Sequence, residues 1–535
     1  MKQLSGIDHA FLQMERGNNY MHVAGLGIYD PSTAAGGKVR FKDILRFFAA
    51  RIERFPHFRR RLVSVPLSLD RPYWVEDADL DVEFHVRHIA LPHPGDWRQL
   101  CIQVARLHSR PLDRSKPLWE AYVIEGLHNV PGVPEGSFAL YTKLHHALID
   151  GEAGSELTRA IHSLSPDDAE AEETAGVTIR VADRDPSAIE IYSRALINNL
   201  QKLPELARFS FDAATRVGGL GAHYLRRMAA DRDRMREKLA ALVSGDLASV
   251  LPRMPATRFT RAVSAHRVVE AVGVSVAELK DIRQKVGDAT INDLFMAIIG
   301  GALNRYLGSK GELPAASMVA GVPMTLRGAD KTQDGNQIGM TIMPVHSELS
   351  DPIERLRAIR ADAAAAKRVS GALGKDMAMN ALQHLPTPLS EAVLRNLKLP
   401  KIGLIVSNVR GPDAGLYMAG ARLVAHAPIS IVVDGIGLNC TGFSYAGTMC
   451  ICAVSCREML PDPEFFAACL REAFVDLAKA ADAHALADAR RLELAHRETA
   501  EAIGRLPARK TVRKRKGKGR PSAVHGNGAG ARVSH

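Results

Sequence analysis

The segment KLHHALIDG, residues 143–151, constrains this 535-residue chain more than any other stretch. The preceding residues 137–142 are rich in β-branched and aromatic side chains, which predicts a strand. Apolar residues recur at helical spacing after the segment, at Leu157, Ile161 and Leu164. Because successive side chains of a strand point to opposite faces, His145 and His146 are expected to have different surroundings and different tasks, rather than to hold one metal ion together.

Each part of this segment also has an ordinary structural interpretation. A histidine at a strand end is commonly a hydrogen-bonded polar residue, and Asp150-Gly151 is a common turn or helix start. The combination His-His-x-x-x-Asp-Gly, however, resembles the active-site signature of acyltransferases related to chloramphenicol acetyltransferase and of peptide-synthetase condensation domains. That resemblance implies acyl transfer.

The basic character of the chain is confined to one end. The formal net charge is +11, yet residues 505–535 hold ten Lys or Arg and no acid, which leaves about +1 for the rest (11 minus 10). The remainder has globular composition, with 46% hydrophobic and 24% charged residues, and is long enough for two domains. We therefore expect a nearly neutral folded body with no nucleic-acid partner, followed by a solvated, mobile basic tail.

The sequence gives little indication of a targeting segment, a membrane helix or a metal site. The first residues contain Asp8 and Glu15 and no apolar core of signal-peptide length, and no later run reaches the ~18 apolar residues of a membrane helix. A cytoplasmic protein is expected. Three cysteines, Cys450, Cys452 and Cys456, crowd one apolar stretch, but they lack the spacing of zinc ligands. We predict no metal site and no cofactor.

The beginning of the chain is similar to that of the bacterial wax ester synthase/diacylglycerol acyltransferase family. In that family an Asp-x-x-Phe-Leu stretch, here Asp8 to Leu12, precedes a Met-His-Val strand, here Met21 to Val23. Further segments resemble family motifs in the same order: Pro72 to Val75, Pro117 to Glu120, Asn292-Asp293, Gly335 to Gly339, Ser407 to Pro412 and Asp434 to Asn439. The chain departs from the family at Thr260 and Arg410, where Asn and Pro are usual, and it lacks the Asp-Phe-Gly-Trp-Gly motif of the plant enzymes. The bacterial lipid branch is therefore favoured.

The resemblance implies an α/β (α+β) fold with two chloramphenicol acetyltransferase-like subdomains. Each would be a mixed β-sheet with covering helices, and an active-site tunnel would lie at their interface. The expected division is an N-terminal subdomain at 1–165, a helical linker or insertion at 166–254, a C-terminal subdomain at 255–480, a helical extension at 481–504 and the basic tail at 505–535.

Residue roles follow from the resemblance together with the chemistry. His146 is the expected general base, because neutral imidazole accepts protons readily near pH 7. His145 is expected to support it, Asp150 to orient or fix the loop, and Gly151 to allow the turn. Asn292 and Asp293 have two open interpretations, substrate binding or the capped start of a helix. Since no Gly-x-Ser-x-Gly elbow is present, we predict direct attack rather than a covalent serine intermediate.

The expected function is transfer of a long-chain acyl group from acyl-CoA to diacylglycerol, with wax ester synthesis as a lesser activity. Two other classes remain open, a condensation-type transferase using carrier-protein thioesters and a non-catalytic lipid-binding protein. The expected location is the inner face of the membrane or the surface of a lipid inclusion.

The middle segment has two helical patterns that bear on this location. One is an apolar stripe at Ile189, Tyr192, Leu196, Leu200 and Leu203. The other, Phe209 to Leu242, interleaves Arg and Lys with apolar residues and is expected either to pack against the protein or to lie on anionic lipid.

Overall fold

The computed structural model describes residues 1–148, 161–167, 185–201, 254–325, 338–372, 387–388, 390–391 and 401–504. The chain divides into two compact units, Met1–His484 and Ala485–His535. The first unit contains the sheets, and the described part of the second is the last portion of a helix.

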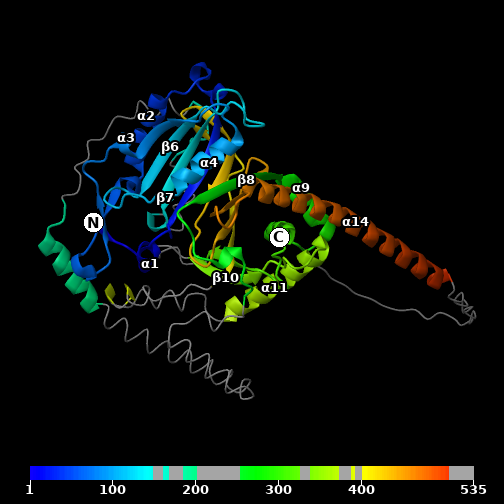
Figure 1. Ribbon diagram of the computed structural model, residues 1–535. Coiled ribbons are helices and arrows are strands. Elements are labelled where there is room, and N and C mark those ends of the chain that lie inside the picture. Colours follow the sequence, from blue (N-terminus) through cyan, green and yellow to red (C-terminus); the bar gives the residue numbers. More distant parts are fainter. Residues whose placement is uncertain are drawn as a thin grey trace, which may run out of the picture. The chain divides into compact units, whose positions relative to one another are not determined.

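The first six-stranded sheet carries the His-His motif at the end of a central strand (Figure 1). Its order is β12 (Tyr417–Met418), β13 (Ala421–Ile429), β2 (His22–Asp30), β7 (Phe138–His145), β6 (Trp119–Glu125) and β5 (Val86–Ala90). All eight residues of β7 are buried, including the polar Thr142, Lys143 and His145. Only β5 and β6 run parallel within it, so the sheet is mixed.

The second six-stranded sheet is also mixed. Its order is β10 (Ile338–Pro344), β9 (Val319–Thr325), β11 (Gly403–Arg410), β14 (Leu438–Tyr445), β15 (Thr448–Cys456) and β8 (Arg267–Ser275). β11 is parallel to both of its neighbours, and the other pairs are antiparallel. A small third sheet joins β1 (Lys2–Gln3), β4 (Tyr73–Glu76) and β3 (Arg60–Val63). The predicted fold class is confirmed.

The first sheet draws strands from both ends of the chain. β12 and β13 follow β11 of the second sheet in sequence, yet β13 pairs antiparallel with β2, with Pro428 opposite Gly25. The two sheets are therefore tied together by the course of the backbone as well as by packing.

Helices cover the sheets on several sides. They are α1 (Gly6–Met14), α2 (Phe41–Arg54), α3 (Val82–His85), α4 (Trp97–His108), α9 (Val276–Val286), α10 (Ile291–Ser309), α11 (Pro352–Ala372) and α14 (Pro463–Gly504), with a further described helix at 188–201. α4 begins with a capping box in which the Asp96 carboxylate accepts from Gln99 N at 2.8 Å. Gly95 before it has φ 68°, and a Cβ there would lie 1.9 Å from the Gly126 carbonyl oxygen, so only glycine fits.

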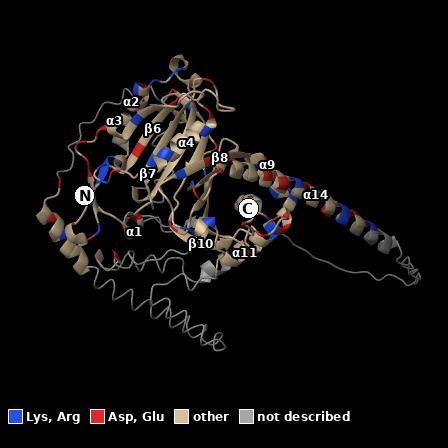
Figure 2. Cartoon of the chain, in the orientation of Figure 1, with Lys and Arg blue, Asp and Glu red and all other residues tan. Residues whose placement is uncertain are grey.

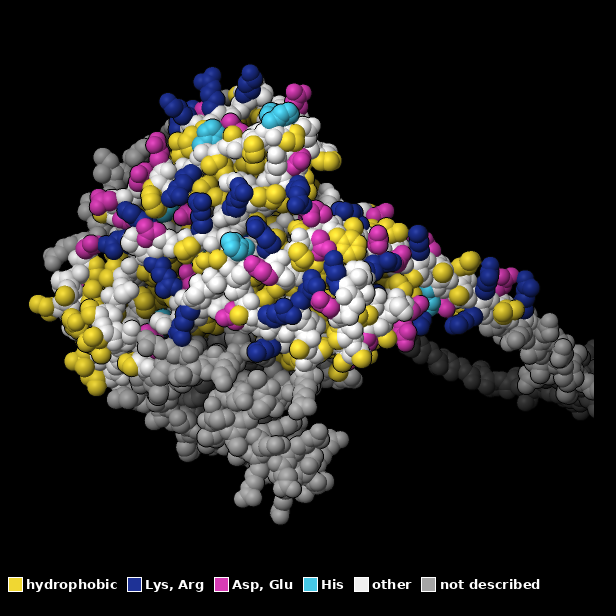
Figure 3. All heavy atoms as spheres, in the orientation of Figure 1, with side chains coloured by type: hydrophobic (Ala, Val, Ile, Leu, Met, Phe, Trp, Pro, Cys, Tyr) yellow, Lys and Arg dark blue, Asp and Glu magenta, His cyan; other side chains and the backbone are white. Residues whose placement is uncertain are grey.

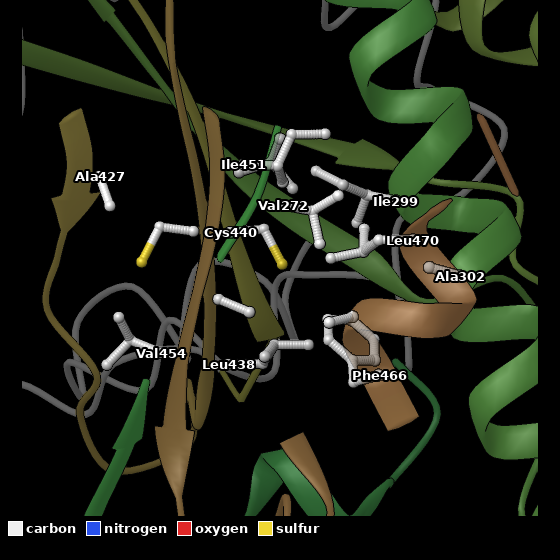
Figure 4. Packing of buried hydrophobic residues seen from close by; sticks show 14 of the residues in the cluster. Val272, Ile299, Ala302, Ala427, Leu438, Cys440, Ile451, Val454, Phe466 and Leu470 are labelled. Atoms are coloured by element: carbon white, nitrogen blue, oxygen red, sulfur yellow. The ribbon is translucent and has the colours of Figure 1, made fainter. Parts of the chain in front are cut away.

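The largest hydrophobic cluster joins the second sheet to its helices. Val272, Leu438 and Ile451 of the sheet pack toward Ile299 and Ala302 of α10 and toward Phe466 and Leu470 of α14 (Figure 4). Small residues let α10 approach closely: a Cβ at Gly300 would lie 2.1 Å from the Val345 carbonyl oxygen. α10 is thus a core helix.

Lys and Arg positions are interspersed with Asp and Glu positions along the ribbon (Figure 2). Among the described residues, no single helix has the length and apolar composition of a membrane span. α9 and α10 pass that test only together, as a pair bent by 99°.

Candidate active site

The His-His motif lies where β7 ends. His145 is the last residue of β7, and His146 begins the short 3₁₀ helix η5 (His146–Leu148). The His146 amide donates to the Met21 carbonyl at 2.7 Å, which fixes the turn against the start of β2. The predicted strand is found. The predicted helix after the motif, with Asp150 and Gly151, lies mostly outside the described residues.

One helix, α1, supplies a contact to each histidine. The Phe11 ring stacks on the His146 ring with centroids 4.0 Å apart and planes inclined by 21°. Four residues later Glu15, at the end of α1, accepts a hydrogen bond from His145 Nε2 at 2.8 Å. Residues four apart lie on one side of a helix, so a single element reaches both rings. The two histidines therefore have different surroundings, one aromatic and one ionic.

The hydrogen bonds of His145 determine its tautomer. Ala147 N donates to His145 Nδ1 at 3.0 Å, so that nitrogen carries no hydrogen and Nε2 carries it toward Glu15. A hydrogen on Nδ1 would point at the N–H hydrogen of Ala147 and repel it. His145 is thereby engaged on both ring nitrogens, and its arrangement suits a supporting residue.

Glu15 joins this arrangement to the rest of the N-terminal segment. It accepts from Met21 N at 3.2 Å and lies 3.7 Å from Arg114. Burial raises the pKa of Glu15, but the hydrogen bond from His145, reinforced by Arg114 and the Met21 amide, outweighs it and leaves the pKa below its ordinary value. Glu15 therefore holds His145 through its ring and His146 through Met21.

Burial sets the protonation state of His146. Loss of solvent, with a smaller contribution from His145, lowers the pKa of His146 to about 4. Its imidazole is therefore neutral at pH 7, the form that can accept a proton.

This shift predicts the pH dependence of catalysis. If His146 is the base, kcat/KM should stay nearly level from pH 8 down to about 5 and fall with a midpoint near 4, instead of near the ordinary value of 6.5. Initial rates over this range, with unfolding followed at each pH, would check it. A midpoint near 6.5 in folded protein would show that the working base is solvated.

The same shift has a stability consequence with a definite sign. The unfolded chain takes up the His146 proton first as the pH falls, since the folded-state pKa is the lower one. The stability that the folded state gains from holding His146 neutral is complete above about pH 6.5 and is lost as the pH falls toward 4. Stability measurements are therefore the necessary control for the acid limb.

Two more neutral histidines lie behind the motif. His22 is opposite His145 in the β2–β7 register and donates from Nε2 to the His108 carbonyl at 2.9 Å. His108 accepts from the Tyr141 hydroxyl at 2.9 Å and donates to the Ser430 carbonyl at 3.3 Å. Burial lowers the pKa of His108 to about 3 and that of His22 well below its usual value. Both rings serve as uncharged packing and hydrogen-bonding groups.

Lys143 places a charge in the same buried layer. Its Nζ donates to the Leu107 and Arg110 carbonyls at 3.3 and 3.0 Å and lies 3.2 Å from the Glu120 carboxylate. Leu107 lies in the last turn of α4 and Arg110 just past its C-cap, where the helix dipole favours a cation. Burial lowers the pKa of Lys143, and Glu120 opposes that shift. Lys143 thus joins β7, β6 and α4.

Residues from the second half of the chain bind the loop before β2 through hydrogen bonds and a cation–π contact. Arg267 of β8 is buried and donates to the Asn18 carbonyl, with its guanidinium 5.3 Å from the Tyr20 ring centre. Asp434 accepts from Asn19 Nδ2 at 3.2 Å and from Val263 N at 2.8 Å. The Asp434 segment, which resembles a family motif in the sequence, thus binds this loop next to the motif histidines.

An apolar cluster lies beside the His146 ring. Phe11, which stacks on that ring, belongs to a cluster whose members come from both halves of the chain. It comprises Met21, Ile402, Val433 and Ile436, with the partly buried Phe11, Met14, Met254, Ile342, Ile405 and Ile431. The partly exposed members leave apolar surface near the candidate base.

Asn292 and Asp293 open α10. Thr290 Oγ1 accepts from Asp293 N at 3.2 Å, and the Asp293 carboxylate accepts from Thr290 N at 2.8 Å. This capping box gives the nearly buried Asp293 a structural role that needs no substrate, the second of the two interpretations left open by the sequence. Asn292 is half-buried beside it.

Phe11, Glu15 and Arg114 were not assigned roles from the sequence. The four-residue spacing of Phe11 and Glu15, just before the Met-His-Val strand, is the signal that could have found the first two. Among the described residues, no group of three or more His, Cys, Asp or Glu side chains could hold a metal ion.

Family models for the wax ester synthase/diacylglycerol acyltransferase catalytic domain and for the C-terminal domain of the same family match residues 4–295 and 334–478. The chain belongs to the wax ester synthase/diacylglycerol acyltransferase family. It is accordingly an acyltransferase, as its His-His motif indicates.

Relatives match nearly the full body of this family member. A Mycobacterium tuberculosis protein named as a probable diacylglycerol O-acyltransferase is 32% identical over 478 residues, covering 88% of this chain and 98% of its own. The wax ester synthase/diacylglycerol acyltransferase of Marinobacter aquaeolei VT8 has a similar structure, with a TM-score of 0.61 and 25% identity, over 90% of this chain and 100% of that one.

A more distant likeness extends the fold beyond the family. The first condensation domain of the calcium-dependent antibiotic synthetase matches with a TM-score of 0.52 at 15% identity, covering 90% of this chain and 96% of its own. At that identity the likeness concerns the fold alone.

Proposed function

We propose that this acyltransferase moves a long-chain acyl group from acyl-CoA to diacylglycerol, forming triacylglycerol, and makes wax esters from fatty alcohols more slowly. The observation that carries the proposal is the His146 ring, neutral and stacked on Phe11, beside an apolar cluster built from both halves of the chain. Such surroundings suit an apolar alcohol. The relatives named as diacylglycerol acyltransferases favour the glyceride acceptor.

In the proposed reaction His146 is the general base. Its neutral imidazole removes the hydroxyl proton while the alcohol oxygen attacks the thioester carbonyl. The tetrahedral intermediate collapses as the carbon–sulfur bond breaks, and the imidazolium returns the proton to the coenzyme A sulfur. The products are the ester and free coenzyme A, so no cofactor beyond the acyl-CoA substrate is needed.

The depressed pKa of His146 has a mechanistic cost and a benefit. A base with a pKa near 4 is weak, so it takes the proton only as attack on the thioester makes the hydroxyl acidic. In return, nearly every molecule holds the base in its neutral form at pH 7. Concerted proton transfer is therefore expected.

Small side chains give only partial guidance on the acceptor. The small residues from Ala297 to Ala302 leave no room for an acceptor, because they are buried in α10 and serve its close packing. Gly25 and Gly27 of β2 adjoin β13 in the first sheet, where the His426 ring lies over Gly25. The preference for diacylglycerol thus rests mainly on the relatives.

Side-by-side assays would test the acceptor. With palmitoyl-CoA and purified full-length protein, diolein should be acylated faster than hexadecanol at equal dispersed concentrations. A strong preference for hexadecanol would reverse the ordering while leaving acyl transfer at His146 in place. Activity with neither acceptor, but with an acyl carrier protein thioester as donor, would favour the condensation-type alternative.

A further inference from the structure

The Phe11 ring covers one face of the His146 imidazole. The ring centroids are 4.0 Å apart, and the planes are inclined by only 21°. Another phenyl ring stacked on a histidine, Phe41 on His88, lies farther away, with 4.8 Å between the centroids. The Phe11 ring therefore overlaps the imidazole closely, at a distance where the π system of one ring acts on the charge of the other.

The helix that carries Phe11 is fixed on both sides of this residue. At its start, Ser5 Oγ accepts a hydrogen bond from Asp8 N at 3.1 Å and caps the helix. Just after Phe11, the Leu12 carbonyl accepts from Arg114 at 3.1 Å. The backbone of α1 therefore presents the Phe11 ring to the imidazole from a set position.

Stacking leaves the edge of the imidazole open. The two ring nitrogens of a histidine exchange protons in the plane of the ring, so a neighbour on the face does not occupy the place of a donating hydroxyl. His146 also keeps part of its surface exposed. Phe11 can thus fix the plane of the ring without competing with the alcohol.

The proposed reaction places a positive charge on His146 for a short time. Burial and the neighbouring His145 both oppose that charge and lower the pKa of His146. Glu15 binds His145 at 2.8 Å, and Lys, Arg, Asp and Glu side chains are spread over the outside of the body (Figure 3). An aromatic face in contact with the imidazole stabilises the imidazolium, because the π system carries negative charge on its face.

We propose that Phe11 is a positioning residue of the acyl transfer, which holds the His146 imidazole in one plane and stabilises it while it carries the proton of the alcohol. This role rests on the proposed function, since it concerns the same base. An aliphatic side chain of similar size would keep the imidazole buried but would lack the π face. Simple packing and the proposed role therefore differ in what they predict for Phe11→Leu.

Steady-state kinetics with palmitoyl-CoA and diolein, using full-length protein, test this role. Phe11→Leu should lower kcat about tenfold, with KM within about twofold of the parent value, because the lost contact acts on the transition state. Its acid midpoint in kcat/KM should stay near 4, since the imidazole remains buried. Phe11→Ala also admits water to the ring face, so its midpoint should rise toward 6.5.

Two further variants make the result specific. Phe11→Tyr keeps an aromatic face and should retain kcat within about threefold of the parent value. Phe41→Leu is the matched control, because Phe41 also stacks on a histidine but belongs to α2, and its kcat should equal that of the parent. Thermal unfolding of each variant over the same pH range shows whether it is folded.

Three outcomes would overturn the assignment of Phe11: a parent-like kcat in Phe11→Leu, a rise in KM alone, or an equal loss of kcat in folded Phe11→Leu and Phe11→Tyr. A rise in KM alone would mean that the ring binds substrate instead of acting through His146. Full activity of His146→Ala is a separate result, which would refute the proposed base and the role of Phe11 together.

Discussion

His146→Ala is expected to fold as the parent does and to lose acyl transfer by about 10²–10⁴-fold, the usual contribution of a positioned general base. The substitution removes the neutral ring that stacks on Phe11 but keeps the backbone bond from residue 146 to the Met21 carbonyl. Single-turnover rates with palmitoyl-CoA and diolein, beside a thermal unfolding curve, would measure both parts.

His145→Ala is the matched comparison, and its defect should be of another kind. Removing that ring leaves the Ala147 amide without its acceptor, which should cost about 1–3 kcal/mol, and leaves Glu15 with only the Met21 amide and Arg114. Activity should fall less than in His146→Ala, or fall together with stability. Equal and large activity losses in two equally stable variants would show that the two histidines do not divide the work in this way.

Lys143→Met is expected to lower the free energy of unfolding by about 3–5 kcal/mol, because it leaves the Glu120 carboxylate buried without its cation. The Leu107 and Arg110 carbonyls lose their donor as well. Urea unfolding of the purified variant would measure the effect.

The double variant Lys143→Met, Glu120→Gln separates the charge from the packing. If the uncompensated carboxylate dominates, removing its charge should restore much of the lost stability, and the double-mutant cycle should show coupling well above the additive expectation. A single variant as stable as the parent would mean that water reaches Glu120 and that the pair is not buried in solution.

Local features were the ones that the sequence predicted well. The β-branched and aromatic run before the motif predicts β7, and Thr290 with Asp293 predicts the capped start of α10, because both signals depend on residues close in sequence. The His-His motif itself identified the two rings at the end of β7. The family resemblance supplied the two mixed sheets.

Contacts between distant residues could not be predicted in the same way. Glu15 and His145 are 130 residues apart, and nothing in either local pattern links them. The apolar stripe from Ile189 to Leu200 was found from the sequence, but its exposure was not. Helical periodicity reveals an apolar face without revealing whether that face points inward. Here another side of the helix, with Ile191 and Ala195, makes the contact with the body.

The position of β13 in the first sheet also affects how the chain folds while it is being synthesised. β2 and β7 can pair once residue 145 has been made, but the other edge of β2 waits for β13, which ends at Ile429. At ribosomal speeds of about 5–20 residues per second, that interval is roughly 15–60 seconds. During it β2 presents an open strand edge that can recruit another nascent chain. Ribosomes stalled within this interval would therefore release products prone to aggregate, and early folding of this protein should depend on chaperones that shield strand edges.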